Sequence, residues 1–138
     1  MIIDKFLQVS DDQVVTASAA STDVIDFGQA NPNSGMSDRL HVVINVGETA
    51  TAAGAATVAF SVEESTDNSN WTTVVSTVAI GKAALVEGAR IVLPMLVQHG
   101  RYVRVYYTVA TGPLTAGKFS AQVVAGIQAN RAYPDALA

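Results

Sequence analysis

The sequence predicts an all-β fold, a single-domain jelly roll or β-sandwich of about eight antiparallel strands spanning residues 1–138. Nearly every apolar stretch alternates with period two and is rich in β-branched and aromatic residues, which is typical of half-buried strands. Short runs of Gly, Pro, Asn and Asp separate these stretches, with no convincing helix between them. Regular short strands without helices indicate a sandwich or barrel, and eight strands in two sheets is the jelly-roll number.

The alternation predicts each strand and the side chains that share a face. In the third strand Val42, Ile44 and Val46 lie on one face. In the seventh, Val103 and Val105 face one way and the intervening residues face the other. The eight predicted strands lie within residues 13–19, 23–28, 39–46, 57–64, 71–80, 89–96, 101–109 and 118–124.

The two ends of the chain and one proline depart from this pattern. Residues 1–9 are a possible N-terminal arm, and residues 128–138 lose all periodicity, so we expect an extended C-terminal arm there. Pro94 interrupts its strand. Because proline has no N–H to donate to a sheet, that strand is expected at an edge or at a bulge.

The stretch Val109–Val124 contains part of a phosphate-binding motif, since Gly112 is followed after four residues by Gly117 and Lys118. The full motif needs Ser or Thr after the lysine, where this chain has Phe119, and a helix whose first N–H groups meet the phosphates. The residues that follow alternate like a strand instead. We therefore predict the tip and flanks of a β-hairpin rather than a nucleotide site.

The chain carries little charge. Hydrophobic residues make up 49% of it and charged residues 14%, well below the usual quarter. This composition indicates either a surface that is partly covered in the working state or an ordinary β-protein with small polar side chains. There is no cysteine, no signal peptide and no apolar run of membrane length, so we expect synthesis in the cytoplasm, no disulfide framework or thiolate metal site and no membrane partner.

The net charge of −4 is unevenly distributed along the sequence. Residues 4–38 contain six aspartates and one basic residue, whereas residues 90–131 contain five basic residues and no acid. Such asymmetry has two interpretations, which the sequence leaves open. The two halves either steer a partner or neutralise each other within one fold.

No group of residues in the sequence points to catalysis, a cofactor or a metal. Glu63, Glu64 and Asp67 are acidic neighbours without the spacing of an EF-hand, so a solvated strand end and turn is favoured over a calcium site. His41 and His99 belong to no metal-ligand or nucleophile motif. We therefore expect no enzyme, with no catalytic, cofactor-binding or metal-ligating residue.

Tyr102, Arg104 and Tyr106 are predicted to share the outward face of one strand. Three interpretations stay open: the centre of a protein interface, where Tyr and Arg are enriched, an ordinary strand face, or a stacking platform for nucleic acid or sugar. The negative net charge counts against nucleic acid. Trp71 is expected to be a partly buried anchor.

Several stretches resemble small capsid cement proteins of tailed phages, also called decoration proteins. The similarity runs through nearly the whole chain and is carried by Leu7–Gly28, Gly88–Met95, Arg101–Val109, Thr115–Val124 and Asn130–Ala136. This resemblance implies a jelly-roll domain without a catalytic site on the outside of an icosahedral phage head. It also implies binding to a major capsid protein of the HK97-type fold, across capsomer junctions, and resistance to the pressure of packaged DNA.

The resemblance implies partners and a location as well. The family is built of homo-oligomers, for which we expect a dimer first and a trimer second, on the outer capsid surface of the virion and without nucleic acid. The alternative function is a carbohydrate- or receptor-binding β-sandwich module of a phage particle, with Trp71 and Tyr102 as stacking platforms. The candidate residues for partner contact are Tyr102, Arg104, Tyr106, Lys118, Arg131 and Tyr133.

Overall fold

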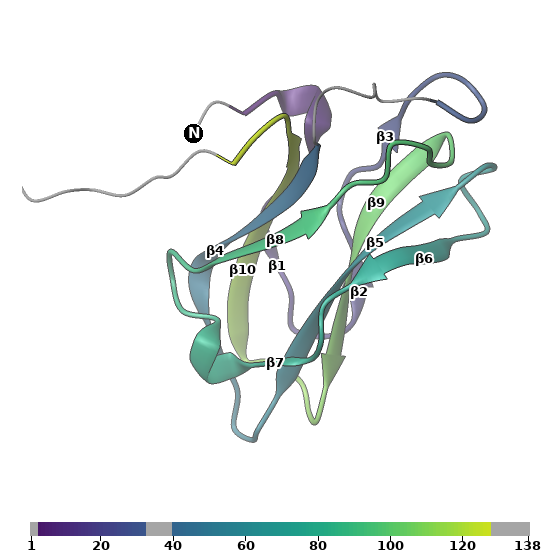
Figure 1. The fold of residues 1–138 in the computed structure, drawn as a ribbon. Coiled ribbons are helices and arrows are strands. Elements are labelled where there is room, and N and C mark those ends of the chain that lie inside the picture. The colour runs from purple at the N-terminus through teal and green to yellow at the C-terminus, as the bar shows by residue number, and fades with distance from the viewer. Residues whose placement is uncertain (1–2, 33–39, 128–138) are drawn as a thin grey trace, which may run out of the picture.

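The computed structural model describes residues 3–32 and 40–127, which form two antiparallel sheets packed face to face (Figure 1). The four-stranded sheet contains, in spatial order, β1 (Gln8–Val14), β10 (Ala116–Val124), β4 (His41–Thr51) and β8 (Arg90–Pro94). The six-stranded sheet contains β2 (Ala19–Ala20), β9 (Tyr102–Ala110), β5 (Thr57–Ser65) and β6 (Thr72–Ser76), with β3 (Ile25–Asp26) also paired to β9 and β7 (Ile80–Gly81) also paired to β5.

The strand order is that of a jelly roll. Strands β2 and β3 both pair with β9, and β6 and β7 both pair with β5, so each of these couples fills one strand position. Eight positions result, and the chain changes sheets at most of its connections. The all-β jelly-roll or β-sandwich fold predicted from the alternation is therefore confirmed.

The alternation also determines which side chains fill the space between the sheets. Val42, Ile44 and Val46 point into the core from β4, as predicted, and Val103 and Val105 do so from β9. All five are buried, and their removal from water is a main source of folding free energy.

Three aromatic rings join the two sheets at the centre of this core. Phe60 and Tyr107 come from the six-stranded sheet, and Phe119 comes from the four-stranded sheet. The Phe119 ring centroid lies 5.3 Å from that of Phe60 in an edge-to-face arrangement and 5.6 Å from that of Tyr107 in a stacked arrangement. Both arrangements are favourable for aromatic pairs and add to the free energy of burial.

A buried hydrogen bond crosses the core beside these rings. The Tyr107 hydroxyl donates to Ser10 Oγ of β1 over 2.8 Å, and Ser10 Oγ donates to Gln13 Oε1 over 2.8 Å. Because Tyr107 and Ser10 are fully buried, these bonds satisfy polar groups that would otherwise destabilise the fold. Burial raises the pKa of the Tyr107 hydroxyl to about 12.

The connection between β9 and β10 differs from the predicted hairpin. β9 belongs to the six-stranded sheet and β10 to the four-stranded one, so this loop joins two sheets rather than two paired strands. The hairpin prediction was wrong because period two identifies a strand but not its neighbour. The loop turns at Thr111 and Gly112, which take positive φ values of 62° and 103°. Phe119 lies within β10, and its side chain is part of the hydrophobic core. Lys118 is therefore followed by a strand and not by a helix N-terminus.

Pro94 ends β8, which within the described residues pairs only with β4 and is therefore an edge strand, as predicted. The next residue, Met95, donates its N–H to the Leu40 carbonyl over 3.1 Å. Hydrogen-bonded and non-bonded positions alternate along an antiparallel pair, so the N–H that Pro94 lacks would point away from β4. The proline therefore costs the sheet no hydrogen bond.

The N-terminal segment, predicted as a possible arm, is folded onto the sandwich where the structure describes it. Lys5–Leu7 form a short 3₁₀ helix, η1, which Asp4 caps by accepting the N–H of Phe6 over 3.0 Å. Leu7 packs against the core just before β1 begins. A second 3₁₀ helix, η2, covers Lys82–Ala84. The predicted C-terminal arm, 128–138, lies outside the described residues.

Candidate functional site

The outward face of β9 carries the three residues that the alternation placed together. Tyr102, Arg104 and Tyr106 are half-buried and alternate with buried residues that point into the core. They lie on the outer surface of the six-stranded sheet, as predicted. Strand β5 runs beside them, with Glu63 directly opposite Arg104 in the register of the two strands.

Arg104 is the centre of a contact network on this face. Its Nε donates to Glu63 Oε2 over 2.7 Å, and its Cζ lies 4.0 Å from the centroid of the Trp71 ring and 5.7 Å from that of Tyr106. We call Glu63, Trp71, Arg104 and Tyr106 the arginine cluster. The side chains of Arg104 and Glu63 are only 19% and 14% exposed, so their attraction is screened less by water than that of an ordinary surface pair.

The arginine cluster is both neutral and ordered. Glu63 compensates the charge of the guanidinium, and the aromatic rings hold its plane through cation–π contact. Trp71, predicted as a partly buried anchor, is half-buried and holds the guanidinium. Sequence reasoning did not predict the pairing of Glu63 with Arg104, because it joins residues 41 positions apart.

A second arginine pair lies at the end of β9. Arg101 binds Asp26 of β3 through two hydrogen bonds, Nε to Oδ1 at 2.7 Å and Nη2 to Oδ2 at 2.9 Å. The side-chain hydrogen bond from Arg101 and the backbone N–H of Gly28 lower the pKa of the Asp26 carboxyl to about 2. The Arg101 guanidinium also lies 5.0 Å from the centroid of the Tyr102 ring.

Lys118 lies on the other sheet. It is on β10, in the four-stranded sheet, and its Nζ lies 2.9 Å from Glu48 Oε2. The hydrogen bond to Glu48 raises the pKa of the Lys118 ammonium. The structure therefore separates Lys118 from the three β9 residues, while Arg131 and Tyr133 lie outside the described residues.

These ion pairs show how three of the five basic residues within 90–131 are neutralised. Arg101, Arg104 and Lys118, from the basic segment, each pair with an acid from the first half of the chain. For these three residues the charge is neutralised within the fold, and one of the three acids, Asp26, belongs to the acidic segment 4–38. The outer surfaces of the two sheets are consequently close to neutral around these residues.

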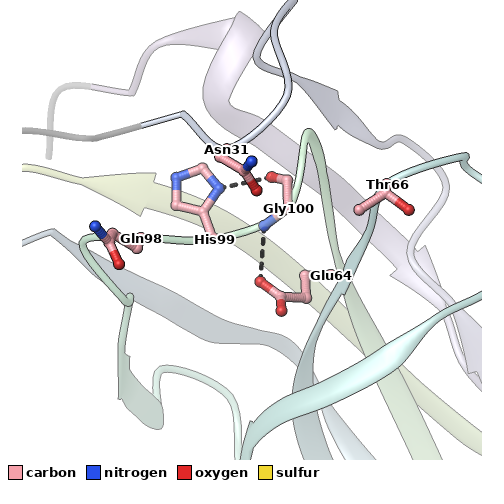
Figure 2. Close-up of a pocket in the computed structure, with 6 residues that line it drawn as sticks. All are labelled: Asn31, Glu64, Thr66, Gln98, His99 and Gly100. Carbon is pink, nitrogen blue, oxygen red and sulfur yellow. Dashed lines mark hydrogen bonds between the residues drawn. The ribbon is translucent and has the colours of Figure 1, made fainter.

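A polar pocket opens at one end of the sandwich, where three loops meet (Figure 2). Its volume is about 480 Å³, and Glu64 forms one wall, with Oε2 accepting the N–H of Gly100 over 2.8 Å. His99 is 7% exposed, and its Nδ1 lies 2.8 Å from the Gly100 carbonyl oxygen. The lining residues are Asn31, Glu64, Thr66, Gln98, His99 and Gly100.

The acidic neighbours considered for calcium do not converge. Glu63 belongs to the arginine cluster and Glu64 to the pocket, while Asp67 accepts hydrogen bonds within its own turn. The backbone N–H of Asn70, followed by its side chain, holds the pKa of the Asp67 carboxyl well below its usual range. Among residues 3–32 and 40–127, no three His, Asp or Glu side chains are placed to hold a metal ion, and no helix is long and apolar enough to cross a membrane.

One comparison with known proteins identifies the family of this chain. A family model described as Bbp16 matches residues 9–123, which cover every strand of both sheets except the first residue of β1 and the last of β10. The chain belongs to the Bbp16 family. A search of curated proteins finds no match.

Proposed function

We propose that this member of the Bbp16 family is a structural virion protein, a cement or decoration protein of a phage capsid. It binds the outer surface of an icosahedral head across capsomer junctions and stabilises the head against the pressure of packaged DNA. Its partners are a major capsid protein of the HK97-type fold and further copies of itself, as a dimer first and a trimer second. It has no enzymatic activity, is made in the host cytoplasm and ends on the virion.

The arginine cluster is the observation that carries this proposal. Tyr, Trp and Arg are the residue types that dominate the energy of protein interfaces, and Tyr106, Trp71 and Arg104 lie together on one sheet face. Because Glu63 already neutralises Arg104, a protein can cover the cluster without burying an unpaired charge. Because the rings already hold the guanidinium, little side-chain entropy is lost on contact.

The interior of the sandwich supports a mechanical role. The aromatic rings and the Tyr107–Ser10 hydrogen bond connect the two sheets, so the body that carries the cluster is well packed. A cement protein contributes a small contact many times over a symmetric lattice. Modest individual contacts then add up to strong attachment when one oligomer engages several capsomers.

The alternative function, recognition of a carbohydrate or receptor, is less well supported by the same residues. Sugar stacking needs an open aromatic face. One face of Trp71 lies against the Arg104 guanidinium, and Arg101 lies 5.0 Å from the ring centroid of Tyr102. Both expected platforms are therefore already partly occupied.

The test is binding to purified phage heads that lack the protein. We expect saturable binding at a fixed number of copies per head and a rise in the temperature at which filled heads release their DNA. A glycan array probed in parallel should show no binding. Absence of head binding, or a glycan affinity without head binding, would contradict the cement function.

A further inference from the structure

We propose that the pocket around Glu64 is a socket for an arginine side chain of a protein partner. This inference names a contact chemistry for the proposed cement function and therefore rests on it. The pocket is separate from the arginine cluster in its chemistry, because it offers a carboxylate where the cluster presents a guanidinium already paired.

The first argument is that no cation among residues 3–32 and 40–127 forms an ion pair with the Glu64 carboxylate. Glu63 and Glu64 are adjacent on β5, yet Glu63 forms an ion pair with Arg104, whereas the printed hydrogen bond of Glu64 comes from a backbone N–H. None of the ion pairs among the described residues includes Glu64. A half-buried carboxylate without a counter-charge favours a cationic ligand.

The second argument is that the carboxylate is held in place. The N–H of Gly100 donates to Glu64 Oε2 over 2.8 Å, which fixes one oxygen and leaves the other available (Figure 2). Gly100 can approach this closely only because it has no side chain, since a Cβ there would lie 2.7 Å from the Ser65 carbonyl oxygen. A fixed acceptor loses little freedom when a ligand binds.

The third argument comes from the other lining residues. Asn31 and Gln98 add amide groups and Thr66 a hydroxyl to the lining, and each of these groups has an oxygen that can accept an N–H. In Figure 2, Gln98 lies beyond His99 on one side, Thr66 lies on the opposite side, and Asn31 lies beside Gly100. A volume of about 480 Å³ has room for a guanidinium and some of its water.

Other ligand classes fit less well. An anion would meet the Glu64 charge, and no Lys or Arg lines the described pocket to offset it. An apolar ligand would gain little, because the described lining contains no large apolar side chain. A divalent metal would need more carboxylate or imidazole ligands than the described residues gather. An arginine remains the best match in charge and in hydrogen-bonding geometry.

The test is a nuclear magnetic resonance titration of the full chain with N-acetylarginine amide. We expect saturable shifts centred on the backbone amide of Gly100. Replacing the carboxylate with an amide (Glu64→Gln) should weaken the binding about tenfold, since it removes the charge but keeps an acceptor for the Gly100 N–H. The matched control is Glu87→Gln, which makes the same change of net charge at an exposed site.

Two further measurements make the result decisive. N-acetylnorleucine amide, which has no charge, should cause no shift at Gly100, and a thermal melt should show that Glu64→Gln is folded. Equal binding by Glu64→Gln and wild type, or shifts elsewhere in the chain only, would overturn the socket.

Head binding by the same variants separates this inference from the proposed function. If wild type binds heads and Glu64→Gln binds them as well as Glu87→Gln does, the socket is wrong and the cement function stands. If arginine binds as expected but wild type does not bind heads, the cement function is wrong. The socket is supported in full when Glu64→Gln loses both arginine and head binding.

Discussion

Tyr106 and Tyr107 are neighbours on β9, and their surroundings differ in every respect. Tyr107 is 0% exposed, packs against two phenylalanines and donates its hydroxyl across the core to Ser10. Tyr106 is half-buried on the outside, next to the guanidinium of Arg104. The inner face of this strand belongs to the core, and the outer face is the one that we propose for recognition. It follows that changes on the inner face should unfold the protein, whereas changes on the outer face should leave it folded.

The largest effect is expected from the inner face of the four-stranded sheet. Replacing the central ring (Phe119→Ala) leaves a cavity between the sheets and should lower the free energy of unfolding by about 3–5 kcal/mol. Thr108→Ala, at an exposed outward position on β9, is the control and should change it by less than about 0.5 kcal/mol. Urea denaturation measures both. A similar loss of unfolding free energy in the two variants would contradict the proposed difference between the inner and outer faces.

A smaller effect is expected from removing the buried hydroxyl. Tyr107→Phe keeps the ring but deletes the hydrogen bond to Ser10, which should lower the free energy of unfolding by about 1 kcal/mol at neutral pH. Chemical denaturation of the variant beside wild type measures the difference. No loss of stability would mean that the bond does not help to connect the sheets.

The same hydroxyl predicts a loss of stability in alkali. Burial raises its pKa to about 12 in the folded protein, whereas in the unfolded chain it ionises near 10. Between these values the unfolded chain has lost a proton that the folded protein keeps, so stability should fall as pH rises through this window. Stability measured from pH 9 to 11.5 should decline less steeply for Tyr107→Phe than for wild type.

The smallest effect is expected at the outward Arg101–Asp26 pair. Arg101 and the Gly28 N–H lower the pKa of Asp26 from 3.8 to about 2. The stabilisation is therefore present above pH 3.8 and is lost as pH falls toward 2. Asp26→Asn should lower the melting temperature slightly at pH 7 and leave it unchanged near pH 2, so the acid end of the curve of melting temperature against pH becomes flatter. A steeper acid loss in the variant would contradict this sign.

Local alternation predicted most of the strands and the direction of their central side chains. The first predicted strand, 13–19, was wrong, because β1 runs over Gln8–Val14 and only Ala19–Ala20 pair after it, and the predicted strand 71–80 is divided into β6 and β7. Val42, Ile44 and Val46 face the core as predicted, and Tyr102 and Arg104 face outward. Burial of one face is enough to fix these directions, because a shift of one residue would turn every side chain to the wrong side.

Pairing between distant strands could not be predicted in this way. The predicted hairpin after β9 is wrong, and Lys118, a predicted interface residue like Arg104, lies on the other sheet. The partner of Arg104 and the position of Glu64 in a pocket depend on which strands and loops meet in space. The alternation of apolar and polar residues within one strand does not indicate which other strands or loops will contact it.

The most direct test of the central claim, that the outer face of the six-stranded sheet is an interface on the head, compares two charge-neutral variants. One disrupts the arginine cluster (Glu63→Gln, Arg104→Gln and Tyr106→Ala), and the other removes the ion pair of the opposite sheet (Glu48→Gln and Lys118→Gln). Both should stay folded. We predict that the first variant loses most of its occupancy on phage heads while the second keeps it, and full occupancy by the first variant would contradict the account.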